Sequence, residues 1–227
     1  MKLVERSFSG KVFRPRPEVL CETDGSLCIV ATPWGPRATA RKVIQSVVDL
    51  FHSARSDDEV TSPFQVLTGL SSMANNLRAA VMLANDTIYR EENRSEYLSG
   101  VELFVAARRN NELAWAHVGG PHVLLDRTGF DLQILAASPD SALAHSDQQQ
   151  MLAPLPSALL GVGPTTNLSV HSVRLQTEDR LVLVHRSVIP PRLQTLKASE
   201  RELVPMSQLL ARQSADLPFW LGILSFA

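Results

Sequence analysis

The sequence predicts an α+β fold in which antiparallel sheets are covered by helices. Short β-like runs follow one another across turn signals, two amphipathic helical stripes lie early in the chain, and one shorter helical segment precedes a final apolar strand. Strands and helices that occur in separate runs do not match repeated βαβ units. The pattern therefore favours two packed antiparallel sheets with helices outside them over a parallel sheet.

The first strands are expected near the N-terminus. Three β-like runs are separated by Ser-Gly, proline-rich and Asp-Gly breaks: residues 3–12, 19–21 and 27–31. Cys21 and Cys28 are the only cysteines, and they flank a turn signal at 23–26, so a hairpin would set them opposite each other. We interpret them as reduced core thiols, because no second pair and no nearby histidine completes a zinc site.

Two helices are expected next. The first follows Pro36 and has apolar residues at helical spacing: Val43, Val47, Val48 and Phe51. The second is expected from about residue 63 to residue 90, with a longer apolar stripe: Leu67, Leu70, Leu77, Val81, Ala84 and Ile88. Each stripe requires a sheet to cover.

The stretch from Gly100 to Asp126 is expected to form an antiparallel meander. Its three apolar runs are separated by an Arg-Asn-Asn turn and a Gly-Gly-Pro bend: residues 101–107, 113–118 and 122–125. Further strands are expected at 130–136, 168–173, 180–185 and 219–226. A short helix is expected at 206–212, and the polar segment 140–150 is interpreted as a loop or short helix.

Length and composition fit one domain spanning residues 1–227. A hydrophobic content of 44% with 20% charged residues is ordinary for a globular protein. A net charge of −1 and a pI near 6.6 give no field that would favour nucleic acid or a membrane as partner. Charged residues interrupt the N-terminus and no long apolar run occurs, so we expect a cytoplasmic protein.

The stretch from Gly100 to Asp126 contains two short motifs, Gly100-Val101-Glu102-Leu103 and Val118-Gly119-Gly120-Pro121-His122. They resemble the Gly-Thr-Thr-Leu and Val-Gly-Asp-Ser-Arg motifs of the metal-dependent protein serine/threonine phosphatases of type 2C, the PPM family. The family's opening motif is matched in spacing by Gly10, Phe13 and Arg16-Pro17-Glu18. The resemblance spans nearly the whole chain and implies a four-layer α-β-β-α sandwich.

The resemblance also implies where a metal site would lie. Family members hold two Mn²⁺ or Mg²⁺ ions with carboxylates, and a bridging hydroxide attacks phosphorus. The matching positions of this chain are Glu18, Thr32, Pro33, Gly120, Arg186 and Asp216. Asp216 is the one unchanged acid, and Glu18 keeps a carboxylate on a longer stem. Thr32, Gly120 and Arg186 replace acids, and a guanidinium repels a nearby dication by several kcal/mol at an effective dielectric of about 20.

The sequence therefore predicts a pseudophosphatase with no catalytic residue and no metal cofactor. It would act in signalling by binding a protein, such as a phosphoprotein or a component of a kinase pathway. The candidate phosphate or partner contacts are Arg14, Trp34, Arg37, His122 and Arg186. Arg186 is expected either to pair with Asp216 or Glu18 or to point to solvent.

Two alternatives stay open. One is a weak Mn- or Mg-dependent phosphatase that uses Glu18, Asp216 and a further acid such as Asp140 or Glu178. The other is a purely structural subunit that makes no use of the cleft. A metal site of imidazoles from His117, His122 and His185 is less favoured than packed or surface histidines. Trp115 and Trp220 are expected in the core.

Overall fold

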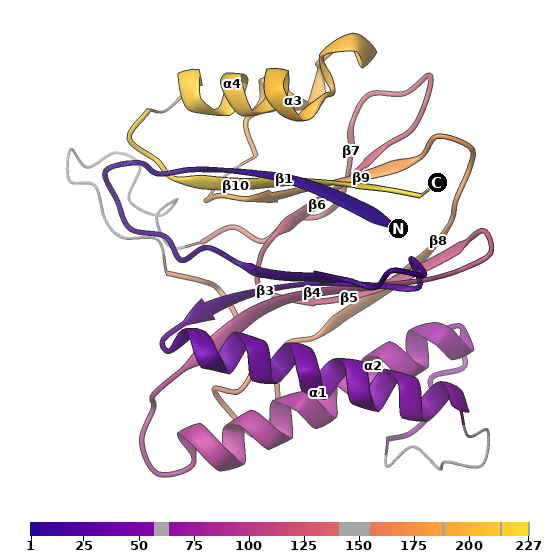
Figure 1. Cartoon of the computed structure of the whole chain (residues 1–227), viewed down its shortest axis with the longest axis vertical. Coiled ribbons are helices and arrows are strands. Elements are labelled where there is room, and N and C mark those ends of the chain that lie inside the picture. Colours follow the sequence, from indigo (N-terminus) through magenta and orange to yellow (C-terminus); the bar gives the residue numbers. More distant parts are fainter. Residues whose placement is uncertain (57–63, 141–154, 188, 214, 227) are drawn as a thin grey trace. The chain divides into compact units, whose positions relative to one another are not determined.

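The computed structural model describes residues 1–56, 64–140, 155–187, 189–213 and 215–226. The chain divides into two compact units. The first unit comprises Met1–Arg16, Gly119–Ser157 and Gln176–Ala227, and the second comprises Pro17–Val118 and Ala158–Leu175. In its described residues each unit contains an antiparallel sheet and helices (Figure 1), which confirms the predicted α+β fold with two antiparallel sheets.

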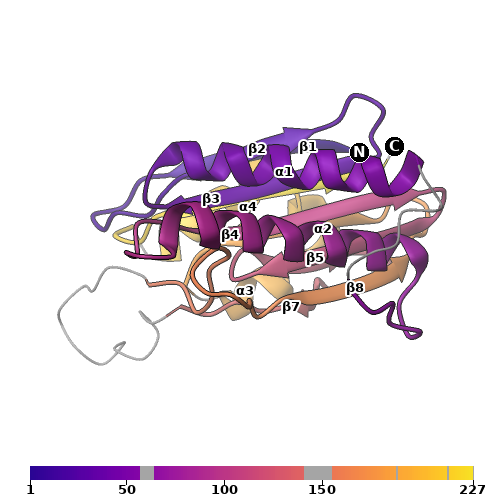
Figure 2. The ribbon, with the colours of Figure 1, turned by 90° about the horizontal axis from the view of Figure 1, so that it is seen from below.

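The second unit is built on a sheet with strand order β2-β3-β4-β5-β8. Its strands are β2 (Glu18–Cys21), β3 (Leu27–Trp34), β4 (Gly100–Arg109), β5 (Glu112–Val118) and β8 (Ser169–Arg174). The helices α1 (Arg37–Ser56) and α2 (Ser72–Ile88) lie side by side on one face of this sheet (Figure 2). Buried side chains between helices and sheet, such as Phe51, Leu77 and Val105, form the core of this unit.

The second helix starts later than its apolar stripe predicts. Ser71 caps α2, and its hydroxyl accepts a hydrogen bond from the backbone N–H of Ala74 at 3.2 Å. Leu67 and Leu70 therefore precede the helix, and Pro63 lies outside the described residues. At its other end α2 continues into a π-helical turn, Tyr89–Asn93.

The first unit has a sheet with strand order β1-β10-β9-β6-β7. Its strands are β1 (Lys2–Phe8), β6 (His122–Asp126), β7 (Gln133–Ala136), β9 (Arg180–His185) and β10 (Phe219–Ser225). One face packs against the short helix α3 (Pro191–Gln194) and the longer α4 (Leu203–Gln213), which are joined by a 3-10 turn, Ala198–Glu200 (Figure 1). The sequence analysis did not predict α3, whose single turn is too short to show a period.

The predicted central meander is wrong at its third strand. β4 and β5 pair as expected, but β6 pairs with β7 and β9 in the sheet of the first unit. The chain changes sheets at the Gly-Gly-Pro bend, where Gly119 has a φ of 68° that only glycine adopts readily. Alternating apolar residues identify a strand but not its partner, so the sequence could not reveal this change.

No helix within the described ranges is both long and apolar enough to cross a membrane. The expected loop at 140–150 lies outside the described residues except for Asp140.

Candidate functional site

A buried carboxylate lies beside Thr32 in the second unit. Thr32 on β3 is directly opposite Glu102 on β4, and the two residues are 1% and 3% exposed. Trp34 lies two residues along β3 on the same face, and its indole Nε1 donates a hydrogen bond to Glu102 Oε2 at 2.7 Å. The sequence analysis missed Glu102 as a site residue, although a glutamate inside an apolar strand is itself a signal.

Glu18 does not share a face of the sheet with Thr32. It lies opposite Ala31, a residue of the core beneath the helices, and it forms ion pairs with Arg37 and, at 3.7 Å, with Arg41 of α1. Because side chains alternate along a strand, Thr32 points to the other face. The predicted grouping of Glu18 with Thr32 in one metal site is therefore wrong, and Arg37 directs its charge to Glu18 although its side chain is 65% exposed.

Pro33 and Trp34 are the last two residues of β3 and not part of a loop, and the chain after them is held at the start of α1. Burial opposes ionisation of Glu92, but hydrogen bonds from Ser99 and Thr39, together with Lys42, outweigh it and hold the pKa of that carboxyl below its ordinary value. Next to this contact Gly35 has a φ of 136°, and a Cβ there would meet the carbonyl of Leu98 at 2.8 Å. The position of Trp34 is thus fixed by its backbone surroundings.

In the first unit a buried ion pair joins Arg14 to Asp140. The two side chains are 4% and 5% exposed. Arg14 Nη2 also lies 3.5 Å from Ser187 Oγ, whereas its buried Nε has no hydrogen-bond partner among the described residues. Arg14 therefore retains donor capacity inside the unit.

Arg186 lies close to this pair but is held by α4. The residue is 5% exposed, and its Nη1 donates to the carbonyl of Leu210, in the last turn of α4, at 2.9 Å. Burial, and then the positive charge of Arg14, lower the pKa of Arg186. Asp216 instead pairs with Lys11 at 3.0 Å, and Glu18 pairs with Arg37 and Arg41. Neither the pairing of Arg186 with Asp216 or Glu18 nor the alternative that Arg186 points to solvent is therefore what the structure has. Among the described residues no carboxylate pairs with Arg186.

His122 uses both of its ring nitrogens within the first unit. Nε2 lies 2.7 Å from the carbonyl of Arg186, and Nδ1 accepts the backbone N–H of Ser138 at 2.9 Å, so the neutral tautomer carries its proton on Nε2. Burial lowers the pKa of His122 to about 4. A neutral and fully bonded imidazole offers no charge to a phosphate, which argues against the predicted contact role of His122.

The residues at the family's metal positions do not fit two dications. Thr32, Pro33 and Gly120 supply no carboxylate, and the acids Glu18 and Asp216 are paired with cationic side chains. Among the described residues no three His, Cys, Asp or Glu side chains form a group that could hold a metal ion. The first unit instead holds two neighbouring guanidiniums, of which Arg14 is paired with Asp140 and Arg186 has no paired carboxylate among the described residues, an arrangement suited to an anion.

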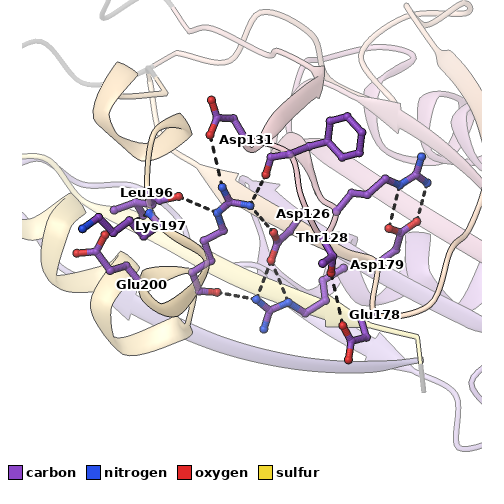
Figure 3. Close-up of polar contacts among 12 residues, drawn as sticks. Asp126, Thr128, Asp131, Glu178, Asp179, Leu196, Lys197 and Glu200 are labelled. Atoms are coloured by element: carbon purple, nitrogen blue, oxygen red, sulfur yellow. Dashed lines mark hydrogen bonds and ion pairs between the residues drawn. The ribbon is translucent and has the colours of Figure 1, made fainter.

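The paired strands β6 and β9 have His122 and Val184 at one end and Asp126 and Arg180 at the other. A polar network lies at the Asp126 end (Figure 3). Arg180 donates to Asp126 Oδ2 at 2.7 Å, and Arg201 donates to Asp126 Oδ1 at 3.0 Å and to the carbonyl of Phe130 at 2.6 Å. A pocket of about 970 Å³ lies against these residues. Since the guanidiniums are already bonded to carboxylates and carbonyls, we interpret this network as structural.

Glu178, one of the acids considered for a phosphatase site, lies at the same end of the β6–β9 pair as Asp126. It has a φ of 67°, and its carboxylate lies 3.5 Å from the Thr128 hydroxyl. It is two residues before the start of β9, whereas Arg186 follows the end of that strand. Asp140, the other acid considered, is paired with Arg14. Neither joins Asp216, whose partner is Lys11.

The remaining histidine and tryptophan predictions concern packing. Trp115 and Trp220 are 3% and 2% exposed, as expected for core residues. His117 stacks on His171 with ring centroids 5.8 Å apart, and burial lowers the pKa of His117 to about 4. Its surroundings agree with a packed histidine.

Solved structures share the fold over the whole chain. The PPM Ser-Thr phosphatase MsPP from Mycobacterium smegmatis, in complex with cacodylate, has a TM-score of 0.66 at 15% identity, covering 100% of this chain and 99% of that one. PppA, a regulatory component of T6SS in Pseudomonas aeruginosa, has a TM-score of 0.64 at 18% identity, with coverages of 99% and 97%. The catalytic domain of the phosphatase PstP with two manganese ions has a TM-score of 0.63 at 17% identity, with coverages of 100% and 98%.

No protein-family model matches the chain, and no curated protein matches it by sequence. At these identities structural similarity speaks for the fold alone. The chain therefore has the fold of the PPM serine/threonine phosphatases.

Proposed function

We propose that the chain is a single PPM-type domain, residues 1–227, that has lost catalysis and acts as a regulatory binding module in the cytoplasm. The observation that carries this proposal is the state of the acids at the family's metal positions. Glu18 is paired with two arginines of α1, and Asp216 is paired with Lys11. The other positions offer a hydroxyl, two residues without a polar side chain, and a guanidinium.

The proposed ligand is a phosphoryl group on a partner protein. Arg14 and Arg186 are buried near each other, and among the described residues Asp140 pairs with Arg14 while no carboxylate pairs with Arg186, which leaves an excess of positive charge. An isolated buried charge is costly, so an anion that balances it gains more than it would at the surface. The hydroxyl of Ser187 is a further donor at this place.

A regulatory role fits the similarity to PppA, which is described as a key regulatory component of T6SS. The net charge of −1 gives no reason to propose nucleic acid or an anionic membrane as partner. We propose a phosphoprotein or a component of a kinase pathway.

Calorimetric titration of chelator-treated protein with Mn²⁺ tests the loss of the metal site. We expect no saturable heat and no hydrolysis of p-nitrophenyl phosphate above the buffer rate. Saturable binding of two ions with hydrolysis that is lost in Asp216→Ala would overturn the proposal.

Binding of inorganic phosphate and of a phosphoserine peptide tests the ligand. We expect phosphate to raise the thermal unfolding midpoint of the wild type, and Arg186→Met to abolish that rise. Lys11→Met is the matched control, because the Lys11 side chain is 75% exposed and pairs with Asp216. An equal response in both variants would remove Arg186 from the proposed site.

One observation favours the phosphatase alternative. Glu102 supplies a buried carboxylate next to Thr32, an acid additional to those at the family positions. In that case Mn²⁺ or Mg²⁺ would bind with Glu102 as a ligand. Glu102→Gln would then lose both the calorimetric signal of metal binding and the hydrolysis. A Trp34→Phe variant, which removes the indole N–H but keeps an aromatic ring, would keep them.

A further inference from the structure

The two thiols of the β2–β3 hairpin face each other. Cys21 lies directly opposite Cys28 in the antiparallel register. The next pair toward the turn is hydrogen-bonded, since the N–H of Glu22 donates to the carbonyl of Leu27 at 2.9 Å. Cys21 and Cys28 therefore form a non-hydrogen-bonded pair, in which Cα atoms lie about 4.5 Å apart and side chains are closest. A disulfide requires a Cα separation of about 4.4 to 6.8 Å, so the register permits one.

The turn of the hairpin fixes this register. Gly25 has a φ of 70°, and its N–H donates to the carbonyl of Glu22 at 2.9 Å. The backbone N–H and the hydroxyl of Ser26 donate to the carboxylates of Asp24 and Glu22 at 2.8 and 2.7 Å. His52 of α1 contacts Glu22 at 2.5 Å and ties the hairpin to the helix. Slippage that would separate the thiols is thus opposed by several contacts.

The two thiols differ in access. Cys21 is partly exposed, whereas Cys28 is 0% exposed. A side-chain hydrogen bond with Cys21, followed by burial, raises the pKa of the Cys28 thiol. A dissolved oxidant therefore reaches Cys21 first, with Cys28 held beside it as a protonated thiol.

We propose that Cys21 and Cys28 form a reversible disulfide when the protein meets a hydroperoxide such as hydrogen peroxide. The Cys21 thiolate attacks one oxygen of hydrogen peroxide and the O–O bond breaks. Hydroxide departs, takes up a proton to become water, and Cys21 is converted to a sulfenic acid. The Cys28 sulfur then attacks the Cys21 sulfur, the S–O bond breaks, and the hydroxyl departs as water with the Cys28 proton. Two thiols lose two electrons, and the peroxide is reduced to two waters.

The bond would fasten the edge strand β2 to β3. β2 begins at Glu18, which pairs with Arg37 and Arg41, and β3 ends at Trp34. Oxidation would join β2 covalently to β3. This effect does not depend on which ligand the domain binds. Reduction by a small thiol would release them.

Mass spectrometry of the intact, peroxide-treated native protein tests the proposal. Because the chain has two cysteines, one intramolecular disulfide should lower the mass by about 2 Da, remove both titratable thiols, and be reversed by a thiol reductant. The thermal unfolding midpoint should rise by about 5 °C in the oxidised form. Cys28→Ser should instead accumulate a sulfenic acid on Cys21 that dimedone traps.

A matched control places the thiol on the wrong face. In the double variant Leu20→Cys with Cys21→Ser the loop length is almost unchanged, but the new thiol points away from Cys28. This variant should retain two free thiols under the same treatment. The proposal is overturned if the control crosslinks as readily as the wild type. It is also overturned if the wild type gains about 32 Da as a sulfinic acid, forms linked dimers, or fails to react.

Discussion

The two ends of the β6–β9 pair both hold buried or half-buried arginines, but they differ in how many acceptors surround each guanidinium. At the Asp126 end, Arg180 and Arg201 share one carboxylate and also bond carbonyls (Figure 3). At the His122 end, Arg14 has Asp140, while Arg186 is bonded only to a carbonyl of α4 in the described part of the chain.

This difference separates a structural role from a binding role. A buried guanidinium with a complete set of carboxylate and carbonyl acceptors has little to gain from a ligand. A buried guanidinium without a counter-charge gains from any anion that reaches it. The comparison therefore favours the His122 end as the place where an anion binds. Removing charges from each end in turn tests this assignment.

The largest effect is expected from Asp126→Asn. The change leaves Arg201, whose side chain is 6% exposed, and Arg180 without their shared carboxylate, and we expect the free energy of unfolding to fall by about 3 to 5 kcal/mol. Urea denaturation followed by circular dichroism measures it. Asp131→Asn is the control, because that side chain is 79% exposed and 3.7 Å from Arg201, and it should cost at most about 1 kcal/mol. Equal losses in the two variants would contradict the structural interpretation.

The second effect is a loss of stability in acid that arises at the His122 end. The folded pKa of His122 is about 4, below the ordinary value of 6.5, so between these values the unfolded chain binds a proton that the folded chain does not. Stability should therefore fall by roughly 3 kcal/mol as the pH drops from 6.5 to 4. In His122→Asn this pH dependence should be weaker in urea titrations at several pH values. An unchanged slope would show that His122 is protonated in the folded protein.

A smaller effect is expected from Asp140→Asn. Two neighbouring guanidiniums then lack a paired carboxylate, and we expect a loss of about 2 kcal/mol at low ionic strength. Millimolar phosphate should restore part of this loss, whereas sodium chloride of equal ionic strength should not. The same phosphate should leave Asp126→Asn unrescued. Rescue of both variants, or of neither, would remove the distinction between the two ends.

The smallest effect is expected from Arg186→Met in the absence of phosphate. The variant loses the hydrogen bond to Leu210 but also removes a buried charge without a counter-ion, so its stability should stay within about 1 kcal/mol of the wild type. Arg201→Met should cost more, because the carbonyls of Leu196 and Phe130 lose their donor. Chemical denaturation of both variants decides whether the ranking holds, and the reverse ranking would contradict it.

Much of the fold could be predicted because local patterns carry it. The apolar stripe that includes Val43 and Phe51 predicted α1, and the alternation at Arg180–His185 predicted β9 with the bounds that the structure has. The site was harder to predict. Matching positions placed Glu18 and Thr32 in one cluster, but they lie on opposite faces of one sheet. Glu102 stands out as an acid inside an apolar strand, but its partner Trp34 is distant in sequence, so the sequence did not show what the carboxylate contacts.

The sequence by itself determined most of the strands and the longer helices, because these follow from residue type and short-range periodicity. Tertiary structure alone decided that β6 leaves its neighbour β5 for another sheet, and that Arg186 turns to the last turn of α4 instead of to Asp216. Strand pairing and side-chain contacts depend on which distant segments pack together. Periodicity along the chain reports only local structure, so it does not identify those segments.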